Sequence, residues 1–159
     1  MQLSIIEEWF MAAIELHPDF KDFLRLLNSH GVEYLVVGGY AVGYYGYPRA
    51  TGDMDIWIAI NEENAERVAQ VLREFGMPEL QATKQLFIEK DKIIRMGIPP
   101  VRIEVITGAS GVAFDECYAR REIVEIDDIP VNFISLDDLK LNKRAAGRHK
   151  DLEDIEHLP

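Results

Sequence analysis

Two apolar runs joined through a glycine pair constrain the fold of this chain more than any other part of its sequence. Residues 33–37 predict a buried strand that stops at Gly38 and Gly39, where a tight turn leads into a short helix over residues 40–46. Residues 54–60 predict the next strand. A glycine pair between a strand and a helix lets the backbone approach a phosphate closely, and it also suits an ordinary tight turn.

Two carboxylates, Asp53 and Asp55, stand at the start of the second apolar run. Because successive side chains of a strand point to opposite faces, we expect both carboxylates on one face and Met54 and Ile56 on the other. An Asp-x-Asp pattern also occurs on solvated strands. On a half-buried strand, however, adjacent like charges repel each other, and a divalent cation bound to both carboxylates would remove that repulsion.

A third acid, Glu104, is the only one in the apolar run over residues 101–106, which predicts another strand. A charge in such a strand is costly unless it is paired or bound to a metal. Glu104 is therefore our candidate for completing a catalytic metal site with Asp53 and Asp55. The alternatives are that Glu104 faces solvent or pairs with Arg102, two residues away on the same face.

Positive charge collects near the C-terminus of this acidic chain, at Lys140, Lys143, Arg144, Arg148 and Lys150. Lys143 shares a helical face with Leu136 and Leu139, so we expect it to point inward, where it could neutralise a triphosphate. Arg148 is a second candidate for the same role. A solvated helix face balanced by neighbouring acids accounts for Lys140 and Arg144.

Arg49 and Thr51 flank the start of the acidic strand and are candidates for contact with a phosphate or an acceptor. Four tyrosines just before them could stack on a nucleobase, but the packing of a short helix accounts for most of these, which are Tyr40, Tyr44, Tyr45 and Tyr47.

The rest of the chain alternates helical and extended patterns, which predicts an α/β (α+β) domain with a small mixed β-sheet flanked by helices. We expect an extra N-terminal helix within residues 1–17, a single domain over residues 18–159 and a helical C-terminal segment. Apolar and capping patterns predict helices over residues 3–16, 19–29, 62–75 and 112–119. A further helix is predicted to start at Ser135. In a last predicted helix, Leu152 and Ile155 continue an apolar stripe. Further strands are predicted at 122–126 and 130–134, with a hairpin of residues 85–89 and 92–96.

Composition excludes several classes of protein. The net charge of −11 argues against sequence-independent binding to bulk nucleic acid, which depends on a broad basic face. One cysteine, Cys117, forbids an intrachain disulfide, and no apolar run is long enough to span a bilayer. We therefore expect a cytoplasmic protein without a membrane partner. The N-terminal helix keeps a homodimer or a partner protein open.

Two stretches resemble a known family. The stretch VVGGYAV…PRATGDMDIWI is similar to the signature of the nucleotidyltransferase superfamily, which has the polymerase-beta-like fold: a glycine turn, a short helix and Asp-x-Asp on a strand, with a later third carboxylate. The tail ISLDDLKLNKRAAGRHKDLEDIEHL resembles the closing segment of a small bacterial branch related to the AbiEii-type toxins. Together the two stretches relate residues 19–157 to the superfamily.

The resemblance implies transfer of a nucleoside monophosphate from an NTP to an acceptor, with release of pyrophosphate and with two Mg²⁺ ions, or Mn²⁺ in their place. By position, Gly38 and Gly39 would hold the triphosphate. Lys143 would match the phosphate-facing lysine of the family, and Asp151 would match the acid that follows it.

By the same resemblance, Asp53, Asp55 and Glu104 would bind the metals, and Glu104 would help to activate the acceptor hydroxyl. The third carboxylate of the family is more often Asp, so Glu104 is a departure from the pattern. The acceptor is open between RNA such as a tRNA end, a protein and a small molecule. The alternative function is a catalytically silent nucleotide-binding protein or one partner of a toxin–antitoxin pair.

Overall fold

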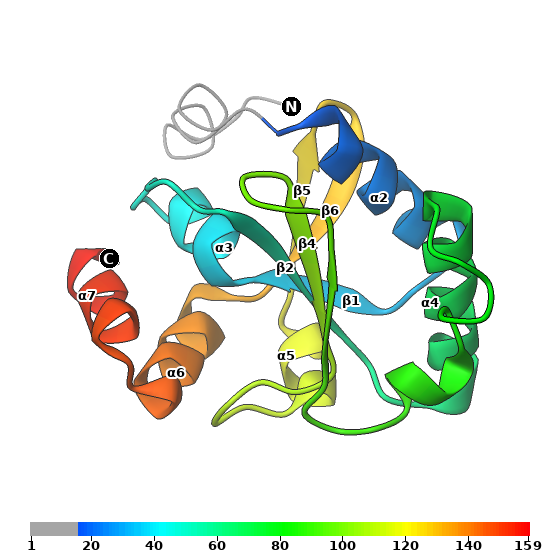
Figure 1. Ribbon diagram of the computed structural model, residues 1–159. Helices are drawn as coiled ribbons and strands as arrows, with labels where there is room; N and C mark the ends of the chain where they lie inside the picture. The colour runs from blue at the N-terminus through cyan, green and yellow to red at the C-terminus, as the bar shows by residue number, and fades with distance from the viewer. Residues whose placement is uncertain (1–15) are drawn as a thin grey trace.

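Within residues 16–159, which the computed structural model describes, six strands form one mixed sheet (Figure 1). In chain order the strands are β1 (Tyr34–Val37), β2 (Asp53–Ile58), β3 (Ile93–Met96), β4 (Arg102–Ile106), β5 (Glu122–Ile126) and β6 (Ile129–Phe133). They lie side by side in the order β3-β4-β2-β1-β6-β5. The mixed sheet predicted from the sequence is confirmed, whereas the expected N-terminal helix lies almost wholly outside the described residues.

Helices flank this sheet on both sides, as the sequence predicts. They are α2 (Pro18–Ser29), α3 (Gly38–Tyr44), α4 (Glu62–Phe75), the 3₁₀ helix η1 (Lys84–Phe87), α5 (Phe114–Ala119), α6 (Leu136–Ala146) and α7 (His149–His157). In Figure 1, α2 and α4 lie to the right of the sheet and α3, α6 and α7 to its left. Among residues 16–159, no helix has the length and apolar character that a bilayer span requires.

The pairing of β2 with its neighbours brings the acidic residues together. β2 runs antiparallel to β1, with Asp55 opposite Val37, and parallel to β4, with Asp55 opposite Glu104. β3 continues the row on the far side of β4, where Arg95 lies opposite Glu104. One row across four strands therefore carries Val37, Asp55, Glu104 and Arg95.

The face of β2 that carries Met54 and Ile56 packs into the core, whereas on the opposite face Trp57 is buried and the two aspartates are partly exposed. Met54 and Ile56 are fully buried, and Met54 lines a small apolar cavity together with Leu24 of α2. Because strand side chains alternate, Asp53 and Asp55 project from the opposite face of the sheet. The alternation predicted from the sequence is confirmed.

Capping residues set the helix boundaries that the sequence predicts. The side chain of Asn61 accepts a hydrogen bond from the Asn64 backbone N–H at 2.8 Å, and α4 begins at the next residue after Asn61. Ser135 Oγ accepts one from the Asp138 N–H at 3.2 Å and so opens α6. Gly147 has a φ of 65° and ends α6, because this left-handed conformation suits glycine.

The predicted hairpin between residues 85–89 and 92–96 is wrong. Residues 84–87 form η1 instead, which buries Phe87 completely, and Arg73 of α4 donates a hydrogen bond to the Ala82 carbonyl just before it. The second segment is a strand, β3, but its antiparallel partner is β4. Packing against α4 therefore overrides the extended propensity of the first segment.

The predicted apolar stripe along the last helix is also wrong. Leu152 of α7 is 48% exposed, whereas Asp151 and Asp154 on the same helix are buried. Burial of two carboxylates is costly unless cations pair with them. The buried face of α7 is therefore an ionic one, and its partners lie in the candidate site.

Candidate active site

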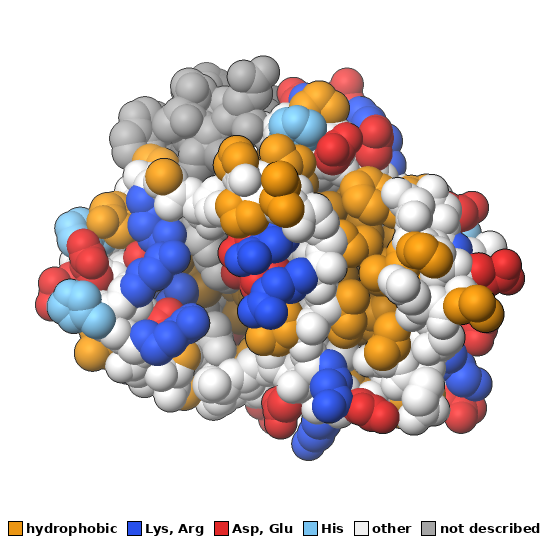
Figure 2. Space-filling view, viewed as in Figure 1, with side chains coloured by type: hydrophobic (Ala, Val, Ile, Leu, Met, Phe, Trp, Pro, Cys, Tyr) orange, Lys and Arg blue, Asp and Glu red, His pale blue; other side chains and the backbone are white. Residues whose placement is uncertain are grey.

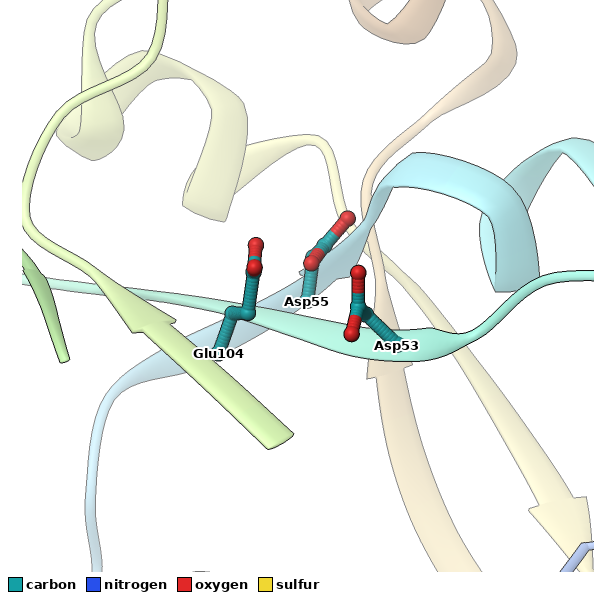
Figure 3. A group of neighbouring side chains, drawn as sticks. All are labelled: Asp53, Asp55 and Glu104. Atoms are coloured by element: carbon teal, nitrogen blue, oxygen red, sulfur yellow. The ribbon is translucent and has the colours of Figure 1, made fainter. Parts of the chain in front are cut away.

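Three carboxylates form the centre of the candidate site. Asp53 and Asp55 come from β2 and Glu104 from β4, and Figure 3 shows all three rising from the same face of the sheet. Each residue offers one carboxylate oxygen, and these oxygens all lie within 4.8 Å of one another. The sequence-based grouping of these three acids is confirmed, and we call them the acid triad.

Asp55 is the most constrained member of the acid triad. Burial, and then the neighbouring Glu104 and Asp53 carboxylates, raise its pKa to about 7. Its Oδ1 atom is buried and has no hydrogen-bond partner among residues 16–159. A buried acceptor without a donor is rare, and a hard cation that prefers carboxylate oxygens would satisfy it. The residues present therefore fit a divalent metal ion.

Arginines already pair with the other two acids. Arg102 donates from Nε to Asp53 Oδ1 at 2.5 Å and from Nη2 to Asp53 Oδ2 at 3.0 Å. Arg95 donates to Glu104 Oε1 at 2.9 Å, and Arg102 Nη2 lies 3.4 Å from the same oxygen. The ion pair between Arg102 and Glu104 left open in the sequence is thus present, alongside membership of Glu104 in the triad.

The glycine pair gives space to polar side chains of the site. A Cβ atom on Gly38 would lie 2.1 Å from Asp55 Oδ2, and Gly38 has a φ of +68°. A Cβ atom on Gly39 would lie 2.7 Å from Thr51 Oγ1. Both glycines are therefore required by the packing of Asp55 and Thr51, whatever else the turn binds.

A cavity of about 610 Å³ opens above the acid triad. Among the described residues, six Lys and Arg side chains and five Asp and Glu side chains line it, although the whole chain has a net charge of −11. Figure 2 shows Lys and Arg side chains gathered on the side toward α7 and near the middle of this face, with others at its lower edge. The cationic lining residues are Arg49, Lys92, Arg95, Lys143, Arg148 and Lys150.

Lys143 points inward from α6, as its helical position predicts, and is 5% exposed. Its Nζ atom lies 3.1 Å from Asp151 Oδ1 and 3.1 Å from Asp154 Oδ2. Although burial opposes ionisation, hydrogen bonds from Arg148 and Lys143 hold the pKa of Asp151 below its ordinary value. Lys143 therefore joins α6 to α7 at the wall of the cavity.

Arg49 reaches the same ionic cluster from the segment before β2. It donates from Nε and Nη2 to the two carboxylate oxygens of Asp154, both at 2.8 Å. Its third nitrogen, Nη1, lies 3.4 Å from where a Cβ on Gly39 would be. Asp154 therefore holds Arg49 and Lys143 at one wall of the cavity, beside the glycine turn.

The predicted nucleotide-binding residues all line this cavity. They are Gly38, Gly39, Arg49, Thr51, Lys143, Arg148 and Asp151. Tyr40, Tyr44 and Tyr45 are buried in the core as expected, and Tyr47 stacks on His157 with ring centroids 4.1 Å apart.

Three further residues of the site were not predicted: Arg95, Arg102 as a partner of Asp53, and Asp154. Asp154 stands three residues after Asp151, a helical spacing that places two acids on one face and could have indicated a shared cationic partner. The contacts of Arg95 and Arg102 depend on the strand register, for which the sequence gives no local signal.

The architecture resembles two solved structures. One is the crystal structure of a candidate nucleotidyltransferase from Thermotoga maritima, with a TM-score of 0.55 and 16% identity over 86% of this chain and 88% of that chain. The other is an antigenic nucleotidyltransferase-like protein from Paracoccidioides brasiliensis, with a TM-score of 0.52 and 19% identity over 87% of this chain and 73% of that chain.

At these identities the likeness shows the fold, because one fold can serve many functions. The chain therefore has the fold of nucleotidyltransferase-like proteins. No protein-family model matches the sequence, and a comparison with curated proteins finds no match either. The finer resemblance to AbiEii-type toxins stays a prediction.

Proposed function

We propose that this protein is a Mg²⁺-dependent nucleotidyltransferase that transfers a nucleoside monophosphate from an NTP to an acceptor and releases pyrophosphate. The observation that carries the proposal is the acid triad, in which Asp53, Asp55 and Glu104 offer oxygens within 4.8 Å of one another at the floor of a cation-lined cavity. The fold shared with nucleotidyltransferase-like structures supports it.

The acid triad would hold the Mg²⁺ ions, for which Mn²⁺ could substitute. Metal bound there would neutralise charge on the phosphates and polarise the α-phosphate toward attack. Asp55 contributes a buried oxygen, Oδ1, that no other described residue binds, and Gly38 gives the Asp55 carboxylate the space to remain there. The strand pairing fixes Glu104 directly opposite Asp55, so the two carboxylates need no rearrangement to face one ion together.

In the proposed reaction one bond forms, one bond breaks and one proton is transferred. The acceptor hydroxyl oxygen forms a bond to the α-phosphorus while the bond from that phosphorus to the bridging oxygen of the β-phosphate breaks. Pyrophosphate leaves with the electron pair, and Glu104 accepts the hydroxyl proton. Most of the rate enhancement would come from alignment and charge neutralisation, as in phosphoryl transfer.

The cationic wall of the cavity would hold the triphosphate. Asp154 binds Nε and Nη2 of Arg49, which leaves Nη1, a donor to the Ala50 carbonyl at 3.5 Å, beside Gly39 as the nitrogen that would reach a phosphate. Arg148 is 77% exposed at the start of α7 and can turn toward a ligand. Lys143 and Asp151 would act indirectly, because the ion pair between them holds this wall of the cavity in place.

A second function has one observation in its favour. Arg102 and Arg95 already neutralise Asp53 and Glu104, so these acids are satisfied without a metal. A catalytically silent nucleotide-binding protein, or one partner of a toxin–antitoxin pair, would retain such a site. RNA, a protein and a small molecule remain the acceptor classes for the enzyme.

A thermal-shift series with ATP, GTP, CTP and UTP, each with and without Mg²⁺, followed by a pyrophosphate assay, separates the two functions. A ligand that binds only the folded state raises the melting temperature. The enzyme predicts a Mg²⁺-dependent shift with at least one NTP, and pyrophosphate release once cell extract supplies the acceptor. A shift without pyrophosphate release would favour the silent binding protein, and no shift with any NTP would contradict both functions.

A further inference from the structure

Arg102 pairs with the acid triad through a geometry that the backbone dictates. It lies directly opposite Asp53 in the parallel pairing of β2 and β4, two residues before Glu104 and therefore on the same face. Arg95 lies directly opposite Glu104 on β3. Each arginine is thus brought to its carboxylate by strand register.

The contact with Asp53 occupies the whole carboxylate. Arg102 donates to both oxygens in the bidentate arrangement that gives arginine its strongest ion pairs. The two side chains are 28% and 25% exposed, and Glu104 is 14% exposed, so water screens these pairs only in part. A cation that binds Asp53 must compete with this guanidinium group.

The sum of the charges at the site also indicates weak binding of a cation on its own. Even with all three carboxylates ionised, the two positive charges of Arg102 and Arg95 leave at most one net negative charge for divalent cations. A nucleoside triphosphate brings negative charge of its own into the cavity. Its phosphates can share the cation with the triad and offset the repulsion from the guanidinium groups.

We propose that Arg102, assisted by Arg95, makes divalent-cation binding at the acid triad depend on nucleotide. Without nucleotide, Arg102 holds Asp53 and keeps cation affinity low. With nucleotide, the phosphates supply the charge that lets the cation bind between them and the triad. This inference rests on the proposed function, and Arg102 acts in it by controlling the charge at Asp53.

The test measures binding of Mn²⁺ alone, by the electron paramagnetic resonance signal of free Mn²⁺, in wild type and in Arg102→Gln. Removal of the guanidinium is expected to tighten nucleotide-free Mn²⁺ binding about tenfold, the equivalent of one partly screened charge contact. The matched control is Arg67→Gln, which removes the same charge from an exposed pair with Glu63 on α4. Its Mn²⁺ affinity should change by less than about twofold.

Measurements with nucleotide analogues distinguish a failure of this inference from a failure of the proposed function. In wild type, the α,β-methylene analogues of ATP, GTP, CTP and UTP are added in turn, and at least one should lower free Mn²⁺ beyond what the same analogue binds in a protein-free sample. Arg102→Gln should gain less from that analogue. Nucleotide-dependent Mn²⁺ binding in wild type, with no gain in nucleotide-free Mn²⁺ affinity in Arg102→Gln, would overturn the inference alone. No Mn²⁺ binding by either protein with any analogue would overturn the proposed function as well.

If Arg102→Gln does not fold, as judged by its urea unfolding curve, Arg95→Gln supplies the measurement. Arg95 is 53% exposed and makes one contact with Glu104, so its loss disturbs the sheet less. Nucleotide-free Mn²⁺ affinity should rise in this variant too, by a smaller factor than in Arg102→Gln. An unchanged or weakened Mn²⁺ affinity would contradict the inference.

Discussion

Gly38 lies directly against Asp55, so that a methyl group added at Gly38 would meet the Asp55 Oδ2 atom at 2.1 Å. This contact joins the two halves of the sequence motif. Gly38 follows β1 and is the first residue of α3, Asp55 lies in β2, and the antiparallel pairing places Val37, the residue before Gly38, opposite Asp55. The glycine is thus a structural requirement of the acid triad itself.

Gly38→Ala should therefore damage the acid triad. The substitution strains a positive φ and pushes on a buried carboxylate, so we expect a loss of about 2 kcal/mol in the free energy of unfolding, measured in urea. Gly31→Ala is the matched control, because Gly31 has nearly the same φ, +66°, and its nearest neighbour is the flexible Arg67 side chain at 3.6 Å. Equal losses in the two variants would show that the contact with Asp55 is not important.

Asp55→Asn should stabilise the protein, and more so at higher pH. Because the pKa of Asp55 in the folded protein is about 7, above its ordinary value of 3.8, ionisation costs folding free energy as pH rises from about 4 to 7. We expect the melting temperature of Asp55→Asn to exceed that of wild type by about 5 °C at pH 8 and by little at pH 4.

The contrasting variant is Asp53→Asn, which removes the carboxylate whose two oxygens both accept hydrogen bonds from Arg102. It should gain no stability at pH 8, because it loses an ion pair. A melting temperature of Asp55→Asn that does not increase relative to wild type between pH 4 and pH 8 would contradict the raised pKa of Asp55.

Lys143→Met should destabilise the fold more than Arg144→Met, the same substitution at the next residue. The substitution leaves Asp151 and Asp154 buried with less compensation, and breaking a buried ion pair on one side costs about 3 kcal/mol or more. Arg144→Met, at the exposed next position of α6, should change the free energy of unfolding by less than about 0.5 kcal/mol. Similar small effects for both would argue that Lys143 is free to serve a ligand.

Asp154→Asn should weaken nucleotide binding without touching the acid triad. Burial opposes ionisation of Asp154, but hydrogen bonds from Arg49 and Lys143 hold its pKa below the ordinary value. Wild-type stability from this group is thus present above about pH 4 and lost below it, and Asp154→Asn should lower stability at pH 7 but be less sensitive to acid.

Loss of the bidentate contact would also release Arg49 from the cavity wall, which should raise the nucleotide dissociation constant about tenfold in isothermal titration. Nucleotide-free Mn²⁺ affinity is the internal control and should stay within about twofold of wild type, since Asp154 is not a member of the triad. Unchanged nucleotide affinity in a folded variant would contradict the positioning role of Asp154.

The sequence could predict the features that depend on interactions between residues close together in the chain. Asp53 and Asp55 were placed on one face because strand alternation is local, and Glu104 stood out because its neighbours are apolar. Ser135 and Gly147 set the ends of α6 through contacts within a few residues. The alternation of Asp53 and Asp55 and the ends of α6 are confirmed because each depends on nearby backbone alone, whereas the position of Glu104 beside Asp55 also requires the pairing of β2 with β4.

The rest depended on long-range packing. The partner of β3 is decided by the chain reversal at residues 97–101, and residues 84–87 become η1 because Phe87 packs against α4. The ionic face of α7 depends on Lys143 of α6 and on Arg49, which precedes α7 by about a hundred residues and reaches Asp154. A short window of sequence does not contain Arg49 together with Asp154, and Leu152 and Ile155 at helical spacing predict an apolar stripe instead.

The most direct test of nucleotidyl transfer is the fate of the α-phosphate. Purified protein is incubated with Mg²⁺, cell extract and each NTP in turn, labelled either at the α- or at the γ-phosphate, and the extract is then fractionated. Transfer of the α label to an acceptor fraction, with the γ label released as pyrophosphate, is the predicted result, and Asp53→Asn and Asp55→Asn should each abolish it. No transfer of the α label with any NTP, or equal transfer by the two variants, would contradict the proposed function.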